Sequence, residues 1–220
     1  MAIGLLATVV CARAQETGQN EPRFLFSKEN GIRVSGFGAP IVEFSSVNDQ
    51  FAVSTGGGGA VLINQTFFIG AYGMGLATDQ PRYTLTALNE SGIPVTYNNY
   101  RPMLGHGGFW LGYIHNSHRM VHWSVSTKIG WGAVSLIDPE YRHNSKDLGW
   151  DGVFVFNPQA ELEINLITWF KMNLGVGWRW VKGVEATYTN ANGLNLPVFE
   201  SFIFDRPTVS LSLLFGNFTK

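Results

Sequence analysis

Two residues with the chemistry of a hydrolase lie close together near the middle of the chain. His122 and Ser124 are separated only by Trp123, and a histidine can act as the base that activates a serine hydroxyl for attack on an ester. Because residues two apart in a strand point to the same side, both side chains share one face. No glutamate follows at short range on this segment. The spacing is therefore compatible with an esterase pair, but the acidic residue that would complete the site is missing from this segment.

Three histidines in the same region are candidate metal ligands: His115, His118 and His122. Imidazole is the commonest ligand type. These histidines are spread over a turn and a strand with no nearby carboxylate or thiol. We therefore interpret them as polar residues at the rim of the fold and predict neither a metal site nor an enzymatic cofactor.

The glycine run from Gly56 to Gly59 could be taken for a phosphate-binding loop. No Lys-Ser or Lys-Thr pair follows it, although phosphate-binding loops require one. We interpret the run as a thin, strongly curved piece of strand.

Paired carboxylates form a second candidate site. Glu161 and Glu163 share one strand face and could be a general acid and base. A row of buried glutamates without cations would cost several kcal/mol. Cationic residues are predicted on the same face, and Arg33 and Glu43 are further candidates for the same interior. We therefore predict a structural ion network in the interior, made of Glu161, Glu163, Lys171, Arg179 and Lys128.

Strict alternation identifies the elements that carry these residues. In segments 121–133 and 170–181, apolar residues occupy every second position, and polar residues or glycine fill the gaps. This period of two is that of strands with one apolar face. Aromatic pairs on that face lie eight residues apart, which is about 27 Å along a strand and roughly 20 Å in height at barrel tilt. We predict two aromatic girdles around a lipid-facing band, formed by Trp123, Trp131, Phe170, Trp178 and Trp180.

The alternation alone does not say which face is inside. A soluble, lipocalin-like barrel would turn the apolar face inward. Eight strands enclose only enough space for side chains to fill, and rings from every strand would overfill it. Paired ions and glycines fit better, so we predict an ion-paired interior and an apolar exterior that contacts lipid.

Eight strands are expected along the chain, with short turns alternating with connections at 78–101, 136–151 and 183–205. Long loops on one rim and short turns on the other are typical of outer-membrane barrels. The expected strands are 32–46, 50–63, 66–77, 102–114, 120–135, 152–166, 169–182 and 206–218. Folding the hairpins about their turns predicts the pairs Val61 with Phe68, Tyr113 with Val121, and Ile164 with Met172.

The composition agrees with a membrane protein. Only 14% of the residues are charged, against roughly 25% in soluble domains. The apolar run Ala2–Ala12 is too short to span a membrane, and an Ala-Arg-Ala-Gln cleavage sequence follows it. We predict a signal peptide over 1–15, a flexible lead-in over 16–31 and the barrel over 32–220. The net charge of −1 implies no nucleic-acid partner.

The long connections are the expected contact surface. Residues 82–88 and 93–97 alternate around a turn, and Asn192-Gly193 is a hairpin signal after residues 184–189. Strands are therefore expected to continue beyond the membrane. Exposed tyrosines are favoured at interfaces, and the candidates in these connections are Tyr83, Tyr97, Tyr100, Tyr141 and Tyr188.

In its alternation, which continues at Val209, Leu211, Leu213 and Phe215, the chain resembles the small eight-stranded outer-membrane β-barrel family of the OmpA and OmpX type. The resemblance implies an eight-stranded antiparallel up-and-down transmembrane barrel in the outer membrane of a Gram-negative bacterium, with membrane lipid as a partner. The pair His122 and Ser124 also resembles the H-x-S pair of outer-membrane lipid A deacylases.

Four functions remain open at this point. The first is a structural or adhesive role, in which the extracellular loops bind a protein or another surface ligand, and we expect this one, without enzymatic activity. The others are a narrow channel for small solutes or ions, an outer-membrane lipid esterase, and a soluble ligand-binding barrel.

Overall fold

The computed structural model describes residues 31–79, 82–88, 91–137, 150–200 and 202–218. Residues 33–220 form one compact unit. The described residues are all-β, and none of them lies in a helix that could cross a membrane. The predicted signal peptide, 1–15, and all of the predicted lead-in except Gly31 lie outside the described residues.

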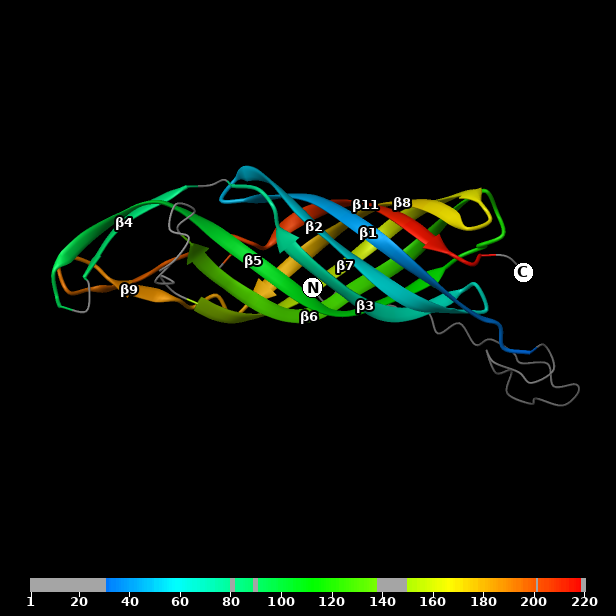
Figure 1. Ribbon diagram of the computed structural model, residues 1–220, viewed down its shortest axis with the longest axis horizontal. Helices are drawn as coiled ribbons and strands as arrows, with labels where there is room; N and C mark the ends of the chain where they lie inside the picture. The colour runs from blue at the N-terminus through cyan, green and yellow to red at the C-terminus, as the bar shows by residue number, and fades with distance from the viewer. Residues whose placement is uncertain (1–30, 80–81, 89–90, 138–149, 201, 219–220) are drawn as a thin grey trace, which may run out of the picture. The chain divides into compact units, whose positions relative to one another are not determined.

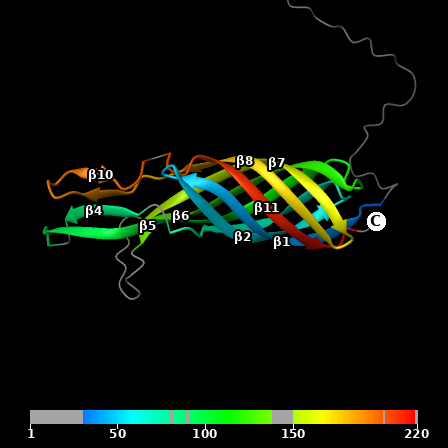
Figure 2. The ribbon, with the colours of Figure 1, turned by 90° about the horizontal axis from the view of Figure 1, so that it is seen from above.

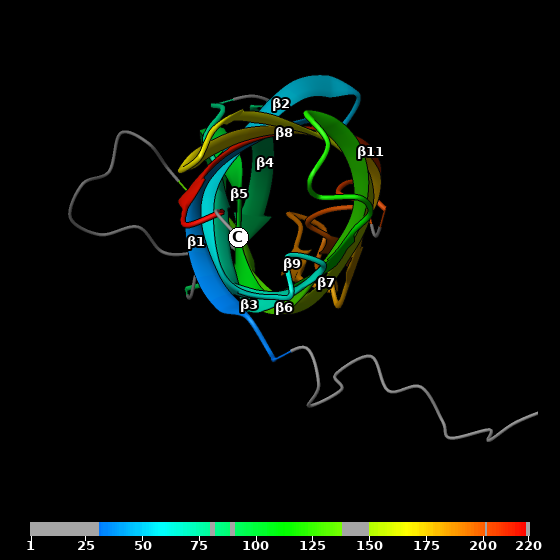
Figure 3. The ribbon, with the colours of Figure 1, turned by 90° about the vertical axis from the view of Figure 1, so that its right-hand side faces the viewer.

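Eight strands close into an antiparallel barrel, which confirms the predicted fold class (Figure 3). Consecutive barrel strands are neighbours, and β1 pairs with β11 to complete the ring. The barrel strands are β1 (Val34–Val47), β2 (Gln50–Ile63), β3 (Phe67–Leu76), β5 (Pro94–Ile114), β6 (Val121–Ile137), β7 (Trp150–Ile167), β8 (Phe170–Lys182) and β11 (Arg206–Gly216).

The two ends of the barrel differ. The short-turn end holds the β2–β3, β5–β6 and β7–β8 turns and the end of β11, whereas the long-loop end holds the three long connections (Figure 1). A two-residue turn between β1 and β2 also lies at the long-loop end, where Asn48 and Asp49 have φ of 50° and 59°. Positive φ at both central residues matches the twist of a tight hairpin.

Three short strands lie in the long connections: β4 (Tyr83–Leu88), β9 (Thr187–Thr189) and β10 (Asn195–Pro197). β4 pairs with the first part of β5, and β9 pairs with β10. A single bridge between Ala87 and Asn190 joins the two hairpins, which extend past the barrel side by side (Figures 1 and 2). β5 spans 21 residues because it continues past the predicted barrel strand 102–114 into this hairpin, as the alternation around residues 82–97 had predicted.

The predicted hairpin registers are right in one case and wrong in two. Ile164 lies opposite Met172, as predicted. Val61 pairs with Ile69 instead of Phe68, because three residues separate the paired Ile63 and Phe67. This shift by one residue turns Phe68 into the interior.

Tyr113 pairs with Val125 and not with Val121. The β5–β6 connection is longer than predicted, and the His115 backbone N–H donates to the carbonyl of Trp123 at its base. Because the shift is four residues, an even number, each side chain keeps its predicted face.

The sequence predicted a polar, ion-paired interior, but only part of the interior wall is polar. Strands β1, β2, β3 and β5 line it with an apolar wall that includes Phe37, Phe68 and Trp110, whose rings meet edge to face. The polar wall comes from β6, β7, β8 and the inward face of β11, together with Glu43 of β1. A second apolar cluster fills the barrel at the long-loop end. Aromatic rings therefore fill part of the interior, whereas the sequence had predicted a polar interior throughout.

Candidate functional site

An ion pair between Glu43 and Arg179 lies in the barrel interior, and both side chains are fully buried. Arg179 Nη1 donates to Glu43 Oε1 at 2.9 Å, and Arg179 Nη2 donates to Ser45 Oγ at 3.1 Å. The second carboxylate oxygen accepts from Asn157 Nδ2 at 2.8 Å. Since β1, β7 and β8 supply these groups, the pair connects strands from different parts of the sequence.

Glu163 accepts two bonds towards the short-turn end. Lys171 Nζ donates to its Oε1 at 2.7 Å, and His122 Nε2 lies 2.9 Å from the same oxygen. Glu161, two residues away, accepts from hydroxyl and amide groups: Ser124 at 3.0 Å, Ser126 at 2.6 Å and Asn173 at 3.0 Å. Both carboxylates are therefore held by interior side chains.

Lys128 bonds to an amide instead of a carboxylate, since its Nζ donates to Gln159 Oε1 at 2.9 Å. The structure thus places all five predicted network residues in the interior, with Glu43 as a sixth. Three carboxylates, at 43, 161 and 163, face three cations, at 128, 171 and 179. Arg33, the other candidate, is exposed at the short-turn end. The balance of charge explains how so many ions are tolerated in the interior.

The candidate esterase pair has no catalytic geometry. His122 bonds to Glu163, whereas Ser124 donates to Glu161. A serine nucleophile needs its hydroxyl within hydrogen-bond reach of the base, and here each residue uses a different carboxylate. Both side chains are also buried in the interior.

The three histidines do not converge on one point. His115 stacks on Trp123 with a ring separation of 4.7 Å, and His118 is exposed in the turn. Among the described residues, no group of three or more His, Cys, Asp or Glu side chains is arranged to hold a metal ion.

The predicted girdle residues face outward. Trp123, Trp131, Trp178 and Trp180 are 48%, 61%, 42% and 38% exposed, and Phe170 is partly exposed. Phe170 stacks on Phe215 of the neighbouring strand at 4.9 Å. Contact of these rings with lipid remains a prediction.

The predicted contact tyrosines are less exposed than expected. Tyr100 is 6% exposed within the apolar cluster at the long-loop end. Tyr83 and Tyr188 pack against the same cluster. Burial and the charge of Glu200 raise the pKa of Tyr83 to about 12, so this phenol stays protonated at neutral pH. Tyr141 and the Tyr97 side chain lie outside what the structure describes.

A segment of the last long connection, residues 198–205 apart from residue 201, plugs the barrel at the long-loop end. Phe199, Ile203 and Phe204 are at most 5% exposed. The carbonyl of Phe204 accepts from Arg179 Nε at 3.3 Å, and Asp205 Oδ1 accepts from the Val181 backbone N–H at 2.6 Å. Sequence reasoning missed this plug, although its apolar pairs, Val198-Phe199 and Ile203-Phe204, were a signal.

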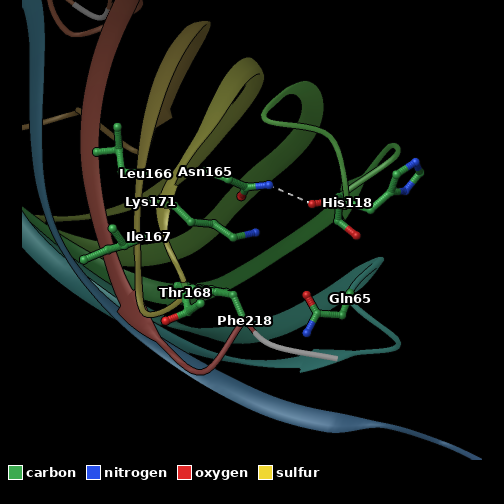
Figure 4. Close-up of a pocket in the computed structure, with 9 residues that line it drawn as sticks. Gln65, His118, Asn165, Leu166, Ile167, Thr168, Lys171 and Phe218 are labelled. Atoms are coloured by element: carbon green, nitrogen blue, oxygen red, sulfur yellow. Dashed lines mark hydrogen bonds between the residues drawn. The ribbon is translucent and has the colours of Figure 1, made fainter.

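At the opposite end a cavity of about 410 Å³ opens between the short turns (Figure 4). Lys171 reaches towards its middle (Figure 4), and Asn165 Nδ2 donates to the carbonyls of Ser117 and Arg119 at 2.9 and 2.7 Å. The described part of the barrel is thus closed by apolar side chains at one end and indented at the other.

Comparison with models of known protein families and with curated protein sequences found no match. A solved structure, the crystal structure of Neisserial surface protein A (NspA), is similar to the chain with a TM-score of 0.54 and 7% identity. The match covers 86% of this chain and 99% of that protein. The barrel fold is therefore shared with a Neisserial surface protein. At this identity the likeness concerns the fold alone.

Proposed function

We propose that this chain is an outer-membrane barrel of a Gram-negative bacterium that holds its long hairpins at the cell surface in a structural or adhesive role. The outward tryptophans, the balanced interior charges and the unequal connection lengths support the membrane placement. The proposal includes no enzymatic reaction, since His122 and Ser124 bond to different carboxylates.

The observation that carries the adhesive role is the apolar tip of each protruding hairpin. Ile93 is 59% exposed beside the β4–β5 turn, and Leu194 is 60% exposed beside the β9–β10 turn. The bridge between Ala87 and Asn190 holds the two hairpins together. An apolar side chain at the tip of each protruding hairpin is available for contact with a partner.

A channel is less well supported. The interior is filled by the ion network along one wall and by aromatic side chains along the other. The plug adds buried phenylalanines at the long-loop end. A continuous wet path would require these groups to move.

Location and adhesion can be tested in the same cells. Expressing cells are fractionated, and the outer-membrane fraction is analysed on a gel with and without boiling. We expect a heat-modifiable band in that fraction. Recovery of the protein in the periplasm without detergent would favour the soluble ligand-binding barrel and overturn the proposal.

Adhesion is measured as retention of intact cells on polystyrene, a defined apolar surface. We expect the double variant Ile93→Ser with Leu194→Ser to lower retention several-fold, because it removes both apolar tips. Asn192→Ser, in the β9–β10 turn, is the matched control and should retain wild-type binding. Equal retention of all three would contradict the adhesive role.

A further inference from the structure

A groove of about 460 Å³ lies on the wall of the barrel across β3, β5 and β6. Its outward-facing lining is mostly apolar and comes from the halves of these strands nearest the short-turn end. It includes Phe67, Leu111, Tyr113, Val125 and Thr127.

The floor of this groove depends on a glycine. A Cβ at Gly112 would collide with the ring of Phe68, which lies on the inner face of the wall. The glycine therefore lets the Phe68 ring pack against the backbone of β5, and both residues contribute to the floor of the groove. The Thr127 hydroxyl beside the groove is buried without a hydrogen-bond partner in the described structure.

The groove leads to the β5–β6 turn, where the character of the surface changes. Tyr113, His115 and Trp123 form a cluster, with the Tyr113 hydroxyl 3.3 Å from His115 Nδ1. Aromatic side chains with a polar edge are favoured where hydrocarbon meets headgroups. Beyond them the turn exposes His118 and Arg119.

The short-turn rim is cationic. Its described residues, 31–34, 63–67, 114–121, 165–170 and 215–218, include Arg33 and Arg119 and contain no Asp or Glu. Around the long-loop end, by contrast, the described residues include Asp49, Asp79, Asp151, Glu185 and Glu200. The described cations at the long-loop end, Arg82, Arg101, Lys182 and Arg206, are each paired with an aspartate. A negatively charged headgroup therefore finds more favourable charge at the short-turn rim.

We propose that the groove is a binding site for one anionic glycerophospholipid of the leaflet next to the short turns. One acyl chain lies along Leu111, Tyr113 and Val125, and the phosphate lies at the β5–β6 turn near Arg119. The proposal rests on the membrane placement proposed above and adds a specific lipid position to it.

The test uses the full-length mature protein refolded in vesicles that contain equal amounts of phosphatidylglycerol and phosphatidylcholine. Native mass spectrometry then measures which lipid stays bound after extraction into mild detergent. We expect the wild-type protein to retain one phosphatidylglycerol in preference to phosphatidylcholine. Arg119→Ala should lower this preference about fivefold, because one cation near an anionic membrane surface contributes about that factor.

Two pairs of matched variants distinguish the contribution of the Arg119 charge from that of the shape of the groove. Arg33→Ala removes a cation from the same rim but lies just before β1, away from the groove, and should keep the preference. Val125→Trp fills the groove and should abolish retention of either lipid, whereas Val176→Trp, on the outward face of β8, should not.

Equal retention of both lipids by the wild-type protein, or equal effects of Arg119→Ala and Arg33→Ala, would overturn this proposal alone. Failure of the wild-type protein to insert, seen as loss of the heat-modifiable band, would overturn the membrane placement together with it.

Discussion

At the residue scale, the interior of this barrel depends on matched charges. Glu43 and Arg179 have no exposed side-chain surface. Removing one partner of such a pair leaves an uncompensated buried charge, whereas removing both leaves none. The Glu43 carboxylate also accepts from Asn157, which moderates the loss.

We predict that Arg179→Met lowers the free energy of unfolding by about 3 kcal/mol. The measurement is urea unfolding in vesicles, followed by loss of the heat-modifiable band. The double variant Glu43→Leu with Arg179→Met is the control and should be more stable than the single variant. A single variant as stable as wild type would show that the pair does not support the fold.

Ser124→Ala should leave lipid A acylation and the hydrolysis of soluble esters at the wild-type level. The Ser124 hydroxyl donates to Glu161, and His122 bonds to Glu163. Loss of an ester-hydrolysing activity in the variant, with the heat-modifiable band retained, would restore the esterase hypothesis.

At the element scale, glycines allow strands to pass close to inward aromatic rings. Gly130 of β6 lies next to Gly107 of β5, and a Cβ at 130 would lie 2.7 Å from the Tyr72 hydroxyl. That hydroxyl bonds to His106 Nδ1 at 3.1 Å. A side chain at 130 would therefore disturb both the strand pairing and this contact.

Gly130→Val should destabilise the barrel by about 1 to 3 kcal/mol, because an overpacked interior forces side chains and backbone to shift. Gly73→Val is the matched control, since no heavy atom lies within 4 Å of its ideal Cβ position. The control should change the free energy of unfolding by less than about 0.5 kcal/mol. Similar losses in both variants in the same urea assay would contradict this account.

At the scale of the whole molecule, the barrel is asymmetric along its axis. Apolar side chains and a plug close the long-loop end, a cavity indents the short-turn end, and ion pairs fill the space between. We expect such an interior to stabilise the barrel and to oppose passage of solutes.

The wild-type protein should give no discrete conductance steps in a planar bilayer, because Phe199, Ile203 and Phe204 are buried in the mouth of the barrel. Regular single-channel steps from protein that shows the heat-modifiable band would instead support the channel.

The alternation in β6 and β8 allowed much of this architecture to be predicted from the sequence alone. A strand has a period of two, so the faces of Trp123, Lys128 and Trp178 follow from the sequence alone once one face is known to be apolar. The eight barrel strands and the interior position of the charged residues were predictable for this reason. The continuation of β5 into a hairpin was visible as well, from its alternation and its turn residues.

Only the tertiary structure decided which residues meet. The pairing of Glu43 with Arg179 joins residues 136 positions apart, and a linear pattern contains no distance between strands that are not consecutive. The register of Val61 depended on a single extra turn residue. The plug exists because a long connection folds back into the barrel, and the sequence pattern does not show this. Tyr100 was expected to be exposed but is buried, because loop residues follow no fixed period and their burial depends on what packs over them.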